Sequence, residues 1–132
     1  MSSLGELLRR WRRDTAGAAA VELALVLPFA ITLLIGCISG SQMLGVINGL
    51  HFAVEEGARC YAVNKSACGT AAAAESFAAS KFSFGGQEPE FSATTGACGR
   101  RMTATVDFEW GLGLKNLSVP LSATSCFPAV PA

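Results

Sequence analysis

Hydrophobic residues fill the first half of the chain almost without interruption. From Ala18 to roughly Gly40 the side chains are mainly Leu, Ile, Val, Phe and Ala, and no Asp, Glu, Lys or Arg occurs from Leu23 to Val54. About 20 apolar residues are enough to cross a bilayer as a helix. The pattern therefore predicts a transmembrane helix near the N-terminus. Pro28 removes one backbone hydrogen bond from it and is expected to kink it.

Beyond this segment the apolar residues recur at helical spacing up to Val63. The stripe consists of Ile47, Leu50, Ala53, Val54, Gly57, Ala58 and Tyr61. The helix is therefore expected to continue to Val63, with the stripe packed against another layer of the protein. Small residues at intervals of four or five let helices approach closely. The helix has four such glycines, Gly36, Gly40, Gly45 and Gly49.

The sequence changes to shorter elements after Val63. Residues Asn64 to Gly69 are expected to form a loop, and Thr70 to Lys81 an alanine-rich helix, because alanine has the highest helix propensity. Gly85 to Pro89 has the composition of a turn. These residues separate the long helix from a segment with a different period.

Residues Arg101 to Trp110 alternate polar and apolar side chains, which is typical of a strand with one buried face. Weaker alternation in 91–97 and 117–123 predicts two more strands, and hence an antiparallel meander. Pro120 cannot donate to a ladder, so the last strand is expected at the sheet edge. A sheet this small needs the outer half of the long helix as a second layer.

The fold class expected is α+β, with a long N-terminal transmembrane helix whose outer half packs on a small antiparallel sheet. Residues 1–17 would form a basic leader, 18–63 the transmembrane and stalk helix, and 64–132 the exported head. The composition agrees, because 51% of the 132 residues are hydrophobic and 15% charged, and the mean hydropathy is +0.41. These values indicate a membrane-tethered chain.

The charges predict an orientation. Ahead of Gly17 the only charged residues are Arg9, Arg10, Arg12 and Arg13, with Glu6 and Asp14. This net positive head is expected to stay in the cytoplasm by the positive-inside rule. The rest of the chain has six basic and eight acidic residues and no basic stripe. Nucleic-acid binding is therefore not expected.

Four of the five cysteines, Cys60, Cys68, Cys98 and Cys126, lie outside the membrane segment, an even number that predicts disulfides in an exported domain. If the strand at 101–110 pairs antiparallel with 117–125, Cys126 reaches the turn that holds Cys98. This hairpin favours a bond between Cys98 and Cys126 and leaves Cys60 to pair with Cys68. The cysteine spacings contain no C-x-x-C, so a zinc site is not expected.

Residue patterns for catalysis are missing from the sequence. His51 is the one histidine, and no Ser-His-Asp order, phosphate-binding glycine loop or metal motif can be built around it. We therefore expect no enzymatic activity, no catalytic residue, no metal and no cofactor.

Glu22 is the most informative residue of the chain. It is the only Asp, Glu, Lys or Arg between Gly17 and Val54. Ionisable groups are costly within a bilayer and usually functional there. A simple membrane anchor has no need of such a residue, although Glu22 could also mark the cytoplasmic edge of the helix.

Three segments of the chain form a recognisable set, namely the run from Gly17 to Phe29, Asn48-Gly49-Leu50 and the stretch from Val54 to Val63. Together they resemble the TadE-like minor pseudopilins of the tight-adherence branch of bacterial type IV pilus systems, and the cysteine-containing end at 121–128 is similar to that of many members. Leu23 stands where the major pilins of this branch usually have tyrosine, which fits a minor subunit. The resemblance implies a type IV pilin-like fold.

The resemblance also implies processing and partners. A prepilin peptidase would cut between Gly17 and Ala18, and Glu22 would neutralise the new N-terminal amine of a neighbouring subunit during assembly. The implied partners are other pilins or pseudopilins through the N-terminal helix, prepilin peptidase, the inner-membrane pilus assembly machinery and membrane lipid. The implied location is a single pass through the inner membrane with a periplasmic C-terminal domain that can enter an extracellular pilus.

Two other functions stay open on sequence grounds. Leu34-Ile35-Gly36-Cys37 resembles the lipobox of bacterial lipoproteins, with Cys37 as the lipidated residue. An amphipathic helix follows Cys37, however, where a lipoprotein would have a polar tether. The second alternative is a signal-anchored module that binds a partner in the periplasm.

Overall fold

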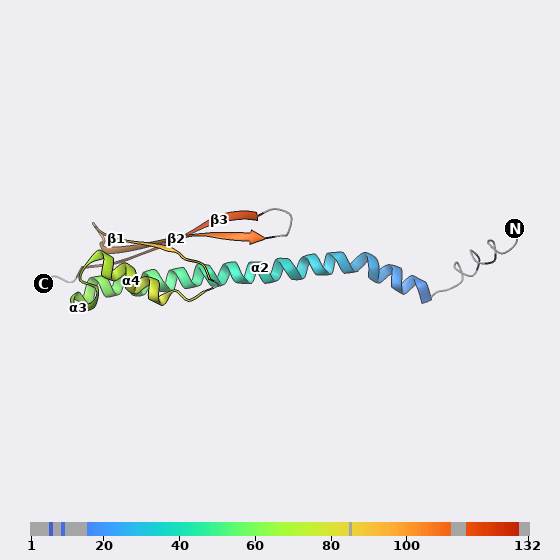
Figure 1. Cartoon of the computed structure of the whole chain (residues 1–132), viewed down its shortest axis with the longest axis horizontal. Helices are drawn as coiled ribbons and strands as arrows, with labels where there is room; N and C mark the ends of the chain where they lie inside the picture. The colour runs from blue at the N-terminus through green and yellow to red at the C-terminus, as the bar shows by residue number, and fades with distance from the viewer. Residues whose placement is uncertain (1–5, 7–8, 10–15, 85, 112–115, 130–132) are drawn as a thin grey trace. The chain divides into compact units, whose positions relative to one another are not determined.

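The computed structural model describes residues 6, 9, 16–84, 86–111 and 116–129, so most of the basic leader lies outside the described residues. Its helices and strands are α2 (Ala16–Val63), α3 (Lys65–Cys68), α4 (Ala71–Lys81), β1 (Glu90–Gly96), β2 (Gly99–Gly111) and β3 (Asn116–Phe127) (Figure 1). The chain forms two compact units, Met1–Ile38 and Ser39–Ala132. The long helix and small sheet confirm the predicted α+β fold.

In the first unit, α2 is apolar on all sides. Its large hydrophobic side chains are exposed, and those of Leu25 and Phe29 are 66% and 78% exposed. The helix continues through Pro28, and the Thr32 hydroxyl donates a hydrogen bond of 2.7 Å to the Pro28 carbonyl oxygen. A helix that is apolar all round is either buried or membrane-spanning. This one is long and apolar enough to cross a membrane, and its most apolar stretch is not buried in the protein.

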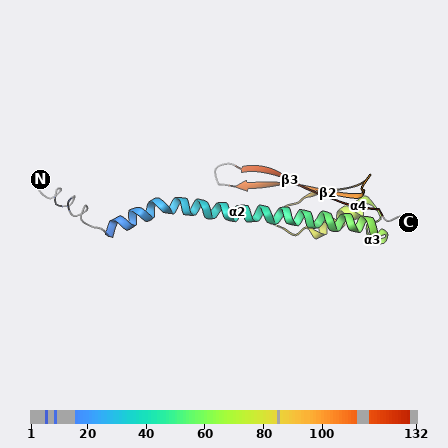
Figure 2. The ribbon, with the colours of Figure 1, turned by 180° about the vertical axis from the view of Figure 1, so that it is seen from behind.

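The second unit contains a three-stranded antiparallel meander in the order β1-β2-β3. Thr103 lies opposite Ser92 of β1 and Thr124 of β3, which fixes the register across the sheet. Pro120 lies in the edge strand β3, as expected, opposite Asp107. Figures 1 and 2 show the sheet and α4 beside the C-terminal part of α2, from opposite sides.

The core of this unit lies between the sheet and the apolar stripe of α2. Its buried residues are Val46, Leu50, Val54, Ala58, Tyr61, Cys68, Ala74, Ala78, Met102, Ala104, Val106, Phe108, Leu121 and Ala123. The stripe and the alternating strand thus face one another, as their two periods predict. The helix packs tightly at Gly57, where an added Cβ would lie 2.7 Å from Cβ of Ala78 and 3.1 Å from Cε of Met102.

The expected loop at Asn64–Gly69 is wrong, because Lys65–Cys68 forms the short helix α3. The side chain of Asn64 accepts a hydrogen bond of 3.1 Å from the backbone N–H of Ala67 and so caps this helix. Thr70 caps α4 in the same way, with a bond of 3.2 Å from Ala73 N–H. Two successive N-caps therefore start two helices where the composition alone suggested a loop and one helix.

Candidate functional site

Gly17 and Ala18 lie in the first turn of α2, and both are exposed. A Cβ added to Gly17 would have no atom within 4 Å. Packing within the chain therefore does not require glycine at this position. Glycine weakens a helix by roughly 0.5–1 kcal/mol relative to alanine, so Gly17 weakens the first turn of α2.

Glu22 lies one helical turn after Ala18, on the same face of α2. Its side chain is exposed, and its neighbours Val21 and Leu23 are 62% and 64% exposed. Because helical residues four positions apart are neighbours on the helix surface, Glu22 and Ala18 lie next to each other along this face. A positive amine created at residue 18, in this chain or in a neighbour, would be a suitable partner for Glu22.

The four glycines of α2, whose spacing suits helix packing, do not form one open surface. A Cβ at Gly36 or Gly40 would have no atom within 4 Å. A Cβ at Gly45 would overlap the ring of Phe84, and one at Gly49 would lie 3.2 Å from the ring of Phe82. Gly45 and Gly49 are therefore used within the chain, to seat two aromatic side chains that follow α4.

The cysteines pair as the hairpin argument favours. Cys60 and Cys68 are bonded with Cα atoms 5.6 Å apart, which ties the end of α2 to α3. Cys98 and Cys126 are bonded with Cα atoms 6.3 Å apart, which ties the turn between β1 and β2 to the end of β3. Cys37 is free and exposed.

Two contacts that position the sheet were not predicted. The Arg100 guanidinium lies 4.2 Å from the ring centroid of Tyr61, at the C-terminal end of α2. The Glu75 side chain in α4 accepts a hydrogen bond of 2.8 Å from the backbone N–H of Ala93 in β1. Glu75 has no signal in the sequence, because its partner lies 18 residues later and is brought to it by tertiary packing.

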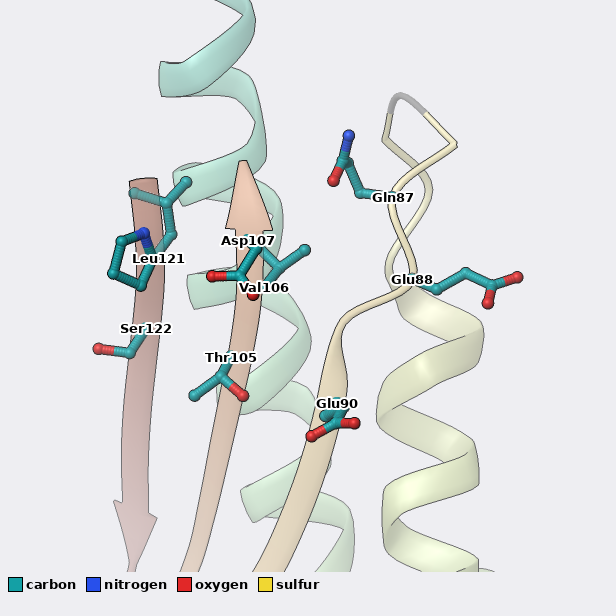
Figure 3. A pocket seen from close by; sticks show the side chains of 9 residues that line it. Gln87, Glu88, Glu90, Thr105, Val106, Asp107, Leu121 and Ser122 are labelled. Atoms are coloured by element: carbon teal, nitrogen blue, oxygen red, sulfur yellow. The ribbon is translucent and has the colours of Figure 1, made fainter. Parts of the chain in front are cut away.

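The outer face of the sheet carries an open hollow of about 540 Å³. Its polar lining includes Glu88, Glu90, Asp107 and the hydroxyl groups of Thr105 and Ser122. In Figure 3 the Glu88 side chain points away from Asp107, and Glu90 lies on the neighbouring strand. Among the described residues no three His, Cys, Asp or Glu side chains are placed to hold a metal ion. The hollow therefore offers an acidic, hydroxyl-rich surface.

Comparison with curated proteins gives no match, and comparison with solved structures gives none either. A family model does match, and it covers the segment with the proposed cleavage junction, Glu22 and most of the helix stripe. The resemblance seen in the sequence is confirmed over these residues. The matching family is described as TadE-like protein, and residues 17–59 of this chain are similar to it.

Proposed function

We propose that the chain is a minor pseudopilin, a structural or assembly subunit of a tight-adherence pilus with no catalytic activity. The observation that carries the proposal is the arrangement at the start of α2, where Gly17, Ala18 and Glu22 lie within a TadE-like segment. The family match supports an association with this pilus system. We propose in addition that the chain is cleaved after Gly17 and serves as a pilus subunit.

In this proposal prepilin peptidase cuts the bond between Gly17 and Ala18. The basic leader is removed on the cytoplasmic side, and the new chain begins with a positive amine at Ala18. The apolar part of α2 then anchors the subunit in the inner membrane, with Ser39–Ala132 in the periplasm, where both disulfides can form.

Glu22 favours assembly of the subunit through a charge pair. A charge pair in low-dielectric surroundings is attractive, whereas either charge alone is costly. Glu22 of one subunit and the Ala18 amine of its neighbour satisfy each other, so leaving the lipid is coupled to joining a fibre. The apolar surface around Glu22 supplies the helix-to-helix contact with other pilins.

The lipoprotein alternative fits the structure less well. Cys37 lies within α2, which is continuous from Ala16 to Val63, and the core begins nearby at Met43 and Val46. A lipidated residue 37 would leave no flexible tether between the lipid and the head. For the signal-anchored interaction module the discriminating observation is the gene neighbourhood, because genes for a secretion ATPase and a prepilin peptidase beside this one would count against it.

Mass spectrometry of the mature N-terminus tests the proposal. We expect the native chain to begin at Ala18, and Gly17→Val to leave only the precursor, because a branched side chain keeps the peptidase from the bond. Gly36→Val is the matched control, since this glycine also has open space around it, and it should be processed normally. A chain that begins at a lipidated Cys37 would replace the pseudopilin proposal with the lipoprotein.

A further inference from the structure

The two edge strands of the sheet, β1 and β3, differ in what lies beside them. Beside β1 lies α4, and the carboxylate of Glu75 takes up the N–H of Ala93 in the middle of the strand. On the other side of the sheet, no element of the described residues pairs with the outer edge of β3. One edge is therefore closed by a side chain and the other is open.

The register shows which backbone groups β3 presents. In an antiparallel sheet each residue points its N–H and C=O to the same side, and successive residues alternate. The backbone N–H of Ala93 points away from β2, toward Glu75. The backbone groups of the preceding residue, Ser92, therefore point toward β2 and bond to Thr103, the residue opposite. Thr103 also lies opposite Thr124 of β3. The backbone N–H and C=O of Thr103 point toward β1 and cannot bond to Thr124. The N–H and C=O of Thr124 therefore point away from β2, to the free edge.

The same alternation places Ser122 and Pro120 in the edge-facing set. Pro120 has no N–H, so it interrupts the row of donors at that edge without weakening the ladder to β2. From Leu121 to Phe127 the edge is an unbroken strand of seven residues. Exposed edges are usually protected by charged side chains, bulges or a covering element. The sequence from Asn116 to Ala132 has no charged residue, so Pro120 is the only such protection within β3.

The direction of the strands restricts what can pair with this edge. Arg100 lies over Tyr61, Met102 lies next to Gly57, and Phe108 lines a hollow together with Val46. Thus β2 runs antiparallel to α2, and β1 and β3 run parallel to it. In subunits anchored in one membrane by the same apolar segment, the α2 helices run in the same direction. The edge strand of a neighbouring subunit beside β3 would therefore run parallel to β3.

In a second copy of this chain, the edge that could meet β3 is β1, at the opposite side of the sheet. The Glu75 side chain of α4 already occupies the N–H of Ala93 there. We infer that β3 is a docking edge for the β1-type edge strand of a different membrane-anchored subunit, and that Glu75 prevents the chain from adding to copies of itself. The partner strand is uncharged, with hydroxyl side chains beside Ser122 and Thr124 and apolar ones beside Leu121 and Ala123.

This inference rests on the proposed function for the identity of the neighbour, a pilin-like subunit. Strand addition supplies main-chain hydrogen bonds, and side chains on alternate positions supply specificity. A closed β1 edge and an open β3 edge let the chain take one partner on one side only. A subunit with one open edge strand ends a row of paired sheets, whereas a subunit with two open edge strands would extend the row.

The test uses the full chain in detergent micelles and a copy with an opened β1 edge as the probe. Glu75→Ala frees the N–H of Ala93, and we expect this variant to form species of two or more copies that grow with concentration in sedimentation velocity. Glu75→Gln keeps a carbonyl oxygen that can accept the same bond and should sediment like the native chain. Far-UV circular dichroism and non-reducing peptide mapping verify that each variant is folded with both disulfides.

A second substitution shows which edge is used. Ser122→Pro removes one edge-facing N–H of β3 without touching the ladder to β2, so added to Glu75→Ala it should return the chain to its native size. Ser122→Ala, which keeps the N–H, should not. The inference is overturned if folded Glu75→Ala does not associate, or if its association survives Ser122→Pro. A chain whose N-terminus is not cut after Gly17 would refute the proposed function and leave this result unaffected.

Discussion

At the scale of single residues, Glu22 has the surroundings least suited to its chemistry. It stands on an apolar helix between exposed Val21 and Leu23, in the segment expected to enter the membrane. Insertion measurements put a charged residue such as Asp at roughly 2.5–3.5 kcal/mol at the bilayer centre, and less near the interface. In the proposed function a partner amine from a neighbouring subunit offsets this cost, so Glu22 would act in assembly and the head would fold independently of it.

We therefore predict that Glu22→Ala leaves membrane insertion and both disulfides unchanged and abolishes or sharply reduces surface pili. Glu22→Asp should rescue assembly only in part, because its shorter side chain misplaces the charge. Pili are counted by electron microscopy, and disulfides by non-reducing peptide mapping. Glu55→Ala is the control, since Glu55 is an exposed glutamate on the same helix, within the second unit. Normal pilus numbers with Glu22→Ala would show that Glu22 only marks the edge of the anchor.

The roles of single residues could be predicted where their contacts follow from the strand register, and could not where the contacts depend on tertiary packing. The pairing of Cys98 with Cys126 could be predicted, because the hairpin register places Cys126 opposite Arg101, close to the turn. The role of Glu75 could not, since its bond to Ala93 depends on how α4 packs against β1. Nor could the seating of Phe84 on Gly45, because nothing in the sequence says where the chain runs after α4.

At the scale of elements, the contact between α2 and its second layer depends on Gly57. We predict that Gly57→Ala destabilises the second unit, because the new methyl group would lie 2.7 Å from Cβ of Ala78, which must move. Overpacking of this kind typically costs about 1–3 kcal/mol. Gly40→Ala is the matched control on the same helix, with nothing within 4 Å. It should be neutral or stabilising by up to about 1 kcal/mol. Thermal unfolding in micelles, followed by circular dichroism, measures both variants.

The two disulfides close loops of different length, with sequence separations of 8 and 28 residues. The chain-entropy model makes the longer loop more stabilising by about 1 kcal/mol at 25 °C. We predict that Cys98→Ser with Cys126→Ser lowers the free energy of unfolding more than Cys60→Ser with Cys68→Ser. Denaturant unfolding of the two double variants tests the order. Equal losses would show that strain or residual structure outweighs loop entropy here.

Elements with a clear period were predicted well. The strand expected at Arg101–Trp110 is observed as Gly99–Gly111, because its alternation is strict and one face is buried. The expected loop before α4 failed, because capping by Asn64 and a disulfide to a buried Cys68 stabilise a four-residue helix. Isolated helices of that length are unstable, so α3 depends on tertiary contacts that periodicity does not record.

At the scale of the whole molecule, the chain combines an apolar helix with a disulfide-bonded α+β unit. The two parts follow different physical rules. Residues 17–35 expose their apolar side chains and need lipid or other helices to cover them, whereas Ser39–Ala132 has its own core. The free Cys37 and the four bonded cysteines fall on opposite sides of this division. Thiol chemistry can therefore examine the membrane span, the disulfides and the orientation together.

We predict that a membrane-impermeant maleimide labels no cysteine of the native chain in intact spheroplasts. Cys37 is then within lipid, where a charged reagent does not reach it, and the other four are bonded. Labelling should occur once per chain in SDS and five times after reduction, counted by mass spectrometry. The control His51→Cys, made together with Cys37→Ser, places a thiol at an exposed position of the second unit and should react in intact spheroplasts. Reaction only after the membrane is opened would place Ser39–Ala132 in the cytoplasm and contradict the proposed periplasmic head.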